Sequence, residues 1–304
     1  MKERITLQNI TQRPAQASGT LTIGGYLTVN RLGFGAMRIT DEGIWGPPKD
    51  KQEAIAVLRR ALELGINLID TADSYGPEVS ELLIAEALYP YPKDLVVATK
   101  GGLLRPGPGQ WVPDGSPKHL REALEGSLRR LRLERIDIYQ FHRPDPKVPF
   151  EVSVGELAKM RAEGKFRHVG LSNVTIDQLA QAQKIVPIVT VQNHYNLANR
   201  ASENMTAAQS EEMIDICARQ GIGFIPWFPL ATGELARSGG PLDQIAKRHN
   251  ATPSQIAIAW LLQRSSTMLP IPGTSSVKHL EENVMGATIK LSKEEFDALN
   301  QASK

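Results

Sequence analysis

The sequence predicts an α/β fold, a single (β/α)8 or TIM barrel with an N-terminal β-hairpin and extra helices near the C-terminus. First, about eight short apolar runs alternate with segments whose apolar residues recur every three or four positions, as parallel strands and helices do. Second, no change in composition divides the chain. Third, the glycine fingerprint of an open dinucleotide-binding sheet is missing, because GFGAMR at 33–38 lacks the third glycine and opens no helical segment.

The predicted barrel begins after a polar N-terminal segment. We expect residues 1–20 to form a poorly ordered extension and residues 21–304 to form the barrel domain. The alternating stretch TLTIGGYLTV at 20–29 turns at Gly24-Gly25, which is typical of a β-hairpin. Many of the later runs are rich in Val, Ile and Leu, as parallel strands covered by helices are. The predicted strands are 32–37, 66–72, 94–100, 135–142, 167–173, 189–196, 221–227 and 267–273.

The segments between these strands have the apolar spacing of helices, and several carry residues that begin or end helices. Gly65 follows one predicted helix, and Thr252-Pro253 precedes another. The predicted helices are 51–65, 80–88, 118–131, 150–164, 177–185, 207–220, 242–250 and 276–284, with additional ones at 251–264 and 293–302.

Composition excludes several classes of function. The 304 residues are 41% hydrophobic and 22% charged, as in soluble globular proteins, and no apolar run is long enough to span a membrane. A net charge of +2 without a basic run argues against nucleic-acid binding. The lone Cys217 cannot form an internal disulfide, and the N-terminus lacks the apolar core of a signal peptide, so we expect a cytoplasmic protein.

Polar side chains with catalytic potential fall at the predicted carboxyl ends of the strands, where the active sites of barrels are built. The run 66–69 ends on Asp70, and Tyr75 follows five residues later. Lys100 ends the next strand, and His142 ends the one after it. Each residue alone has an ordinary structural explanation, but in a barrel all four would converge on one rim.

An acid, a phenol, an amine and an imidazole can together polarise a carbonyl group. The pKa of tyrosine, about 10, makes it a poor proton donor near neutral pH, and a nearby ammonium lowers that pKa by stabilising the phenolate. We therefore interpret Tyr75 as a general acid tuned by Lys100, with Asp70 keeping the lysine charged. His142 would orient the carbonyl oxygen or relay a proton while a hydride reaches the carbonyl carbon.

The same rim carries groups suited to binding a hydride donor. Ser172, Asn173 and Gln192 offer hydrogen-bond donors and acceptors for a carboxamide. Trp227 offers a flat face for a nicotinamide ring. The segment PGTSSVKHLEEN at 272–283 places small polar residues at a helix N-terminus, which favours bound anions such as phosphate.

At these residues the sequence resembles the aldo-keto reductase superfamily, from about Leu21 to Leu299. The resemblance rests on the family's Asp-Thr-Ala-x-x-Tyr segment, its lysine, its His-x-Pro-Asp and Gly-x-Ser-Asn segments, and its strand-borne glutamine. These match, in order, 70–75, 100, 142–145, 170–173 and 192.

The resemblance implies a barrel that binds a nicotinamide dinucleotide without a Rossmann fold and reduces an aldehyde or ketone to an alcohol. It implies that Tyr75 is the general acid, tuned by Lys100 and Asp70, and that His142 orients the carbonyl. The cofactor contacts that it implies are Ser172, Asn173, Gln192, Trp227, Pro229, Leu230, Glu282 and Asn283.

Two departures from the family bear on the choice of cofactor. Many members have a lysine where this chain has Gly273 and an arginine where it has His279, and both help to grip the 2′-phosphate of NADPH. Lys278, aided by Thr274 and Ser275, is expected to substitute for them. We therefore expect NADPH as the cofactor, with NADH as the alternative.

Two loop tryptophans at the same rim, Trp45 and Trp111, are candidate walls of the pocket for a small-molecule carbonyl substrate. No metal site is predicted, and the resemblance implies a monomer or weak oligomer. Two other functions stay open. One is a Schiff-base enzyme with Lys100 as the nucleophile, and the other is an NADPH-binding, redox-sensing subunit without significant turnover.

Overall fold

Seven parallel strands form one curled sheet in the structure, a computed structural model that describes residues 13–230 and 239–302. The strands lie in the order β11-β10-β9-β8-β5-β4-β3, so neighbours in this sheet follow the order of the chain. Each strand overlaps one predicted from the sequence. The strands are β3 (Phe34–Gly35), β4 (Leu68–Asp70), β5 (Val96–Gly101), β8 (Ile136–Phe141), β9 (Phe166–Ser172), β10 (Ile188–His194) and β11 (Gly223–Trp227).

The predicted eighth strand, 267–273, is an extended segment rather than a regular strand, and it closes the ring. On one side the backbone N–H of Phe224 donates to Thr267 (2.9 Å), and that of Leu269 donates back to Phe224 (2.8 Å). On the other side the N–H of Gly33 donates to Pro270 (3.0 Å). Prolines at 270 and 272 have no N–H to donate, so a regular ladder cannot form here. The (β/α)8 barrel is confirmed, with an irregular last strand.

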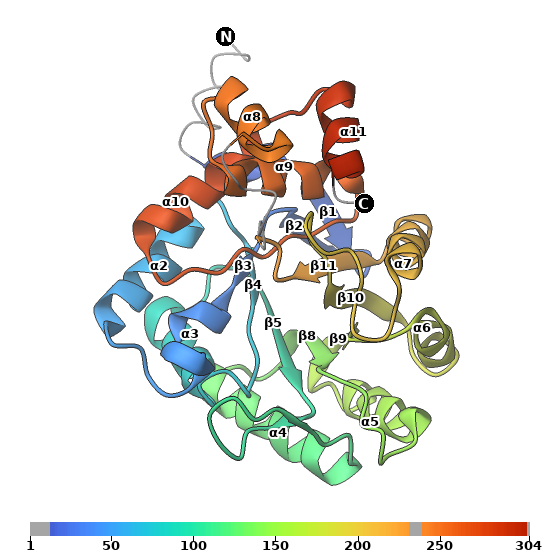
Figure 1. Ribbon diagram of the computed structural model, residues 1–304. Coiled ribbons are helices and arrows are strands. Elements are labelled where there is room, and N and C mark those ends of the chain that lie inside the picture. Colours follow the sequence, from blue (N-terminus) through green and yellow to red (C-terminus); the bar gives the residue numbers. More distant parts are fainter. Residues whose placement is uncertain (1–12, 231–238, 303–304) are drawn as a thin grey trace.

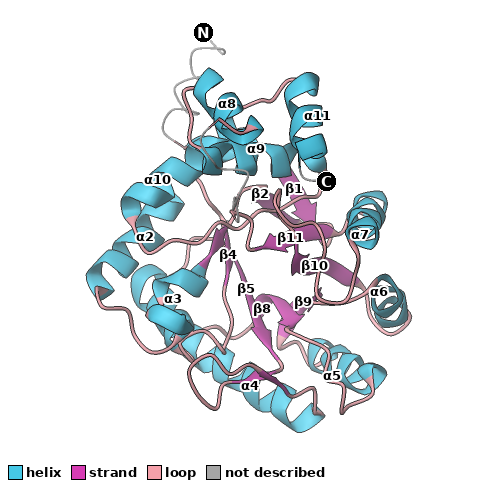
Figure 2. Cartoon of the chain, in the orientation of Figure 1, coloured by secondary structure: helices cyan, strands magenta, loops and turns pink. Residues whose placement is uncertain are grey.

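Helices surround the strands, as Figures 1 and 2 show, and they bury one face against the sheet. Threonines 175, 206 and 252 each begin a helix with a capping box, in which the hydroxyl accepts from the third helical N–H. Within residues 13–230 and 239–302, no helix has the length and apolarity needed to cross a membrane. The helices are α2 (Lys51–Glu63), α3 (Val79–Leu88), α4 (Pro117–Leu131), α5 (Phe150–Ala162), α6 (Ile176–Gln183), α7 (Ala207–Gln220), α8 (Pro241–Arg248), α9 (Pro253–Arg264), α10 (Val277–Met285) and α11 (Lys293–Ala302).

The predicted hairpin is confirmed and closes the end of the barrel where the strands begin. It consists of β1 (Thr20–Ile23) and β2 (Leu27–Asn30), paired antiparallel. Its buried residues Ile23 and Val29 pack on an apolar cluster inside the barrel. That leaves the carboxyl ends of the strands for polar side chains. The cluster inside the barrel also contains Leu68, Val96, Ala98, Ile138, Val189, Ile225, Leu269 and Ile271.

The segment expected to be poorly ordered, residues 1–20, is packed against the domain in the part that the structure describes. Residues Pro14–Ser18 form the 3-10 helix η1, in which Ala15 and Ser18 are buried. The backbone N–H of Ala15 donates to Leu64 at the end of α2 (3.1 Å). Patterns of apolar residues along the sequence do not reveal this contact, because it joins η1 to a helix end about 50 residues later in the chain. Residues 1–12 lie outside the described part of the chain.

Two glycines allow the closing segment to cross β3 with the backbones in contact. A Cβ on Gly35 would lie 2.6 Å from the carbonyl oxygen of Ile271, and a Cβ on Gly273 would lie 2.4 Å from that of Gly35. Real Cβ atoms do not approach backbone oxygens this closely, so any side chain here would push the last segment away from β3.

We expect Gly35→Ala to destabilise the barrel by about 1–3 kcal/mol, because its new methyl group overpacks this crossing. Gly155→Ala is the matched control: Gly155 lies in α5 with open space around it, and this change should stabilise the helix by about 0.5–1 kcal/mol. Urea unfolding of both variants measures the difference. Equal stability of the two variants would contradict the crossing.

Candidate active site

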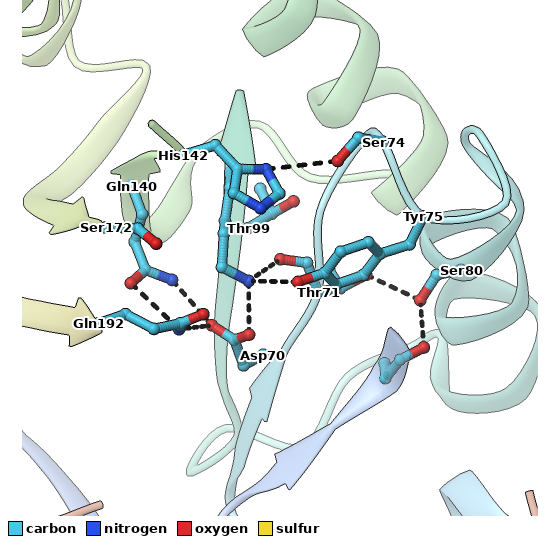
Figure 3. A network of polar contacts seen from close by, with 12 residues as sticks. Asp70, Thr71, Ser74, Tyr75, Ser80, Thr99, Gln140, His142, Ser172 and Gln192 are labelled. Carbon is cyan, nitrogen blue, oxygen red and sulfur yellow. Dashed lines mark hydrogen bonds and ion pairs between the residues drawn. The ribbon is translucent and has the colours of Figure 1, made fainter. Parts of the chain in front are cut away.

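The four predicted catalytic residues meet at the carboxyl ends of β4, β5 and β8. Figure 3 labels Asp70, Tyr75 and His142 among the polar side chains there. The Lys100 ammonium is the centre of the group, and both it and Asp70 are buried. Its Nζ donates to Asp70 Oδ1 (2.5 Å), to the carbonyl of Thr71 (2.8 Å) and to the Tyr75 hydroxyl (3.3 Å). The carboxylate, the amine and the phenol therefore form one connected polar group.

Lys100 is held in its charged form. Burial by itself lowers the pKa of a lysine, but here the Asp70 carboxylate, and after it Tyr75, raise the pKa of Lys100 above its ordinary value. An ammonium with three oxygen partners has no lone pair to offer. The site is therefore built around a fixed positive charge.

The pKa of Tyr75 lies above its ordinary value, opposite to the direction expected from the sequence. Burial is the main cause, because it penalises the phenolate; Lys100 lowers the pKa, and Asp70 raises it further. The sequence-based prediction for the pKa of Tyr75 considered the Lys100 ammonium but not the burial of the phenol. Tyr75 thus keeps its proton at neutral pH, and the charge of Lys100 favours the phenolate form.

His142 stands edge-on to Tyr75, with ring centroids 5.8 Å apart at 82°. Burial lowers the pKa of His142 well below its usual value, and the charges of Lys100, Arg143 and Arg105 lower it further. The imidazole is therefore neutral, with one N–H to donate. Its Nδ1 lies 3.3 Å from the Ser74 hydroxyl, a partner that the sequence argument did not single out.

Two glutamine amides hold the second oxygen of Asp70. Gln140 Nε2 donates to Asp70 Oδ2 at 2.8 Å, and Gln192 Nε2 donates to the same atom at 2.9 Å. Gln140 was missed, although its position two residues before His142 places it on the same face of β8. Gly170 leaves room for it, because a Cβ there would lie 2.7 Å from Gln140 Cγ.

The side chain of Asn173 joins three parts of the site. Its Nδ2 donates to the His142 carbonyl (3.1 Å) and to Ser172 Oγ (3.0 Å), and its Oδ1 accepts from Trp227 Nε1 (3.1 Å). Its backbone φ of 58° lies in the left-handed region, which asparagine tolerates better than most residues. Asn173 is thus already bonded within the protein, and it fixes the position of the Trp227 ring.

A cavity of about 510 Å³ opens over this group. Trp111 lines it, whereas Trp45 does not, although Trp45 was expected as a second wall. The other predicted site residues on its lining are Asp70, Tyr75, His142, Ser172, Asn173, Gln192, Trp227, Pro229, Leu230 and Gly273.

The remaining predicted cofactor residues lie beyond Gly273, in and before α10, and are not part of the cavity lining. Ser275 and Lys278 are exposed, whereas Thr274 and Asn283 are buried. The Lys278 ammonium is 4.0 Å from Glu282. We expected the N-terminus of α10 to bind an anion. Its first N–H, that of Val277, already donates to the Glu53 carboxylate of α2 (2.9 Å), which would compete with a bound phosphate.

Comparisons with known proteins identify related oxidoreductases. Residues 31–304 match the model of the Aldo/keto reductase family. The chain is 53% identical over 290 residues to an uncharacterised oxidoreductase of Schizosaccharomyces pombe, covering 95% of this chain and 92% of that protein. It is 44% identical over 295 residues to the pyridoxine 4-dehydrogenase of Escherichia coli, covering 95% and 99%. An aldo/keto reductase of Klebsiella pneumoniae, solved in complex with NADP and acetate, superimposes with a TM-score of 0.76 at 25% identity, covering 93% and 94%.

Asp73 lies in the turn after β4, and it is a buried carboxyl group with an unsatisfied oxygen. It is 8% exposed, and its Oδ1 has no hydrogen-bond partner among the described residues. Burial, together with the charge of Glu81, raises the pKa of Asp73 well above its usual value. Ionised Asp73 is therefore a cost to the folded state.

We expect Asp73→Asn to stabilise the protein by roughly 1–3 kcal/mol near pH 7. The folded pKa exceeds the unfolded one, so wild-type stability falls as pH rises from about 4 through the folded pKa, and asparagine removes that loss. Urea unfolding between pH 4.5 and 8 measures it, with the exposed Asp297→Asn as a control of little expected effect. A gain that did not grow with pH would contradict the argument.

Proposed function

Because this chain belongs to the aldo/keto reductase family and is therefore an oxidoreductase, we propose that it reduces an aldehyde to an alcohol with NADPH, and that pyridoxal is its substrate. The observation that carries the reaction type is the contact between the protonated phenol of Tyr75, which lines the cavity, and the buried ammonium of Lys100. The neutral imidazole of His142 beside them completes the group.

The residues divide the reaction between them. The His142 N–H donates to the carbonyl oxygen and directs it toward Tyr75. Tyr75 gives its proton to that oxygen, and Lys100 stabilises the phenolate that remains. When bound, the reduced nicotinamide supplies a hydride to the carbonyl carbon. Hydride and proton together convert the aldehyde to a primary alcohol and leave the nicotinamide oxidised; the same groups serve the reverse direction.

The cavity fits a nicotinamide carboxamide. Gln192 uses its Nε2 on Asp70, and no described residue donates to its Oε1, so that oxygen is free to accept from the amide. The Ser172 hydroxyl accepts from Asn173 and has its own proton left to donate. Trp227, fixed by Asn173, presents a flat face beside them. NADP in the Klebsiella pneumoniae reductase supports the choice of cofactor.

The substrate is proposed from the relative of known activity together with the shape of the site. A chain 44% identical to pyridoxine 4-dehydrogenase over 95% of its length has a ready candidate in pyridoxal, the aldehyde at the 4-position of the pyridoxine ring. Trp111 supplies an aromatic wall beside Tyr75, with ring centroids 6.4 Å apart. A small, flat ring aldehyde suits a cavity of this lining.

The Schiff-base alternative is disfavoured by the state of Lys100. Its Nζ donates to three oxygens, and its pKa is raised, so it is a poor nucleophile. Borohydride treatment in the presence of an aldehyde would trap substrate on Lys100 if that reaction occurred.

Steady-state turnover tests the proposal. Purified protein with NADPH should reduce pyridoxal, and Tyr75→Phe should lower kcat by roughly 100- to 10,000-fold, because the phenol that donates the proton is gone. NADPH binding, followed by tryptophan fluorescence, should change little in this variant. Full activity of Tyr75→Phe would remove Tyr75 from its role. NADPH binding by wild type without turnover of any aldehyde would favour the redox-sensing alternative.

Cofactor preference depends on charges around the N-terminus of α10. We expect Lys278→Ala to raise the Kd of NADPH about fivefold and leave that of NADH nearly unchanged, because only NADPH carries a 2′-phosphate. Glu53→Gln should act in the opposite direction, since Glu53 places a carboxylate on the same helix end. Fluorescence titration with both cofactors measures these changes. An equal rise in the Kd of NADPH and of NADH in Lys278→Ala would mean that Lys278 does not contact the 2′-phosphate.

A further inference from the structure

Arg105 binds three loops around the mouth of the cavity. Its Nη1 donates to the carbonyl of Ser74 (2.8 Å), its Nε to that of Gln110 (3.0 Å) and its Nη2 to that of Gly43 (3.4 Å). Ser74 immediately precedes Tyr75, so one of the three loops carries the proposed proton donor. Arg105 and Gln110 stand on the same loop, 105–111, so this one side chain braces its own loop and ties it to the loops that carry Ser74 and Gly43.

The guanidinium also lies between two tryptophan rings. It is 3.6 Å from the centroid of Trp111 and 5.4 Å from that of Trp45. We call Arg105, Trp45 and Trp111 the Arg105 cluster. No carboxylate among the described residues forms an ion pair with Arg105, so its described partners are carbonyl oxygens and aromatic faces. A planar, weakly hydrated guanidinium can make both kinds of contact at once, whereas an ammonium cannot reproduce the fork.

Trp111 needs such support. It stands on the loop between β6 (Leu103–Leu104) and β7 (Val112–Pro113), a hairpin with only two paired positions. Two-residue strands hold a loop weakly. Arg105 covers one face of the indole, and Tyr75 meets it edge-on at an interplanar angle of 77°. Arg105 stands on this same loop, so its side chain and that of Tyr75, rather than the two paired positions of the hairpin, decide the orientation of Trp111 on the cavity wall.

We propose that Arg105 is a positioning residue that holds Trp111 as a fixed aromatic wall, and that this wall gives the enzyme its preference for flat ring aldehydes over chain aldehydes. The inference rests on the proposed function and adds how the substrate class is selected. A ring aldehyde stacks or packs edge-on against an indole already in place, whereas a flexible chain gains little from it. Trp45 contributes by packing on Arg105 from outside the cavity.

The test compares a ring aldehyde with a chain aldehyde. In Arg105→Met we expect KM for pyridoxal to rise about tenfold, with kcat within about threefold of wild type, while KM for butanal stays nearly unchanged. Arg105→Lys should raise KM for pyridoxal less than Arg105→Met does, because lysine keeps the positive charge but lacks the planar guanidinium with its several N–H donors. Trp111→Leu should raise KM for pyridoxal to a similar extent.

The double variant separates positioning from direct contact. If Arg105 acts through Trp111, Arg105→Met combined with Trp111→Leu raises KM for pyridoxal no more than Trp111→Leu alone. Arg38→Met is the matched control, since Arg38 also lines the cavity and its guanidinium lies over Phe228 rather than over Trp111. It should leave the ratio of the two aldehydes' kcat/KM values unchanged.

Other results of these experiments would each contradict one part of the proposal. Equal loss of kcat for both aldehydes in Arg105→Met, with NADPH binding retained, would mean that Arg105 acts on the Tyr75 loop through Ser74. Additive effects in the double variant would overturn the action through Trp111. If wild type reduces benzaldehyde but not pyridoxal, the proposed substrate fails, and benzaldehyde serves as the ring aldehyde in the same comparison. Absence of turnover with both rings would overturn both proposals.

Discussion

The buried ion pair between Asp70 and Lys100 is the constraint on which the rest of the site depends. Two charges out of water are stable only when their remaining hydrogen-bonding capacity is used. The site meets this requirement with two glutamine amides on Asp70 and with the Thr71 carbonyl and the Tyr75 hydroxyl on Lys100. The pair and its partners come from four strands, β4, β5, β8 and β10, and from the loop after β4, so the pair can be satisfied only when these strands are assembled in the curled sheet. Folding and assembly of the site are therefore the same event.

Around this pair, single side chains link segments that the chain brings in from far apart. Asn173 connects the end of β8 to Trp227 at the end of β11, and Arg105 connects three loops over the cavity. Both use several hydrogen bonds at once, which locks their rotamers. Polar groups preorganised in this way lose little freedom when a ligand arrives.

The protonation states in the site follow from burial as much as from the neighbouring charges. The charge of Lys100 lowers the pKa of Tyr75, but burial raises it and outweighs that effect. His142 follows the same rule, because burial and three nearby cations keep it neutral. Each group is thus held in the form that can donate a hydrogen bond or a proton, which is the form that polarising a carbonyl requires.

The sequence alone determined the order of strands and helices, the hairpin, and the strand ends on which Asp70, Lys100 and His142 stand, because hydrophobic periodicity is local and a barrel collects its strand ends on one rim. The folded structure alone decided the roles of Gln140, Ser74 and Arg105, the unsatisfied state of Asp73 and the location of Trp45 outside the cavity. The irregularity of the last strand follows from two prolines that the sequence already shows, at 270 and 272, although 267–273 was predicted as a strand. The contacts of Gln140 and Ser74 join residues 70 and 68 positions apart, and neither such contacts nor burial leaves a periodic pattern in the chain.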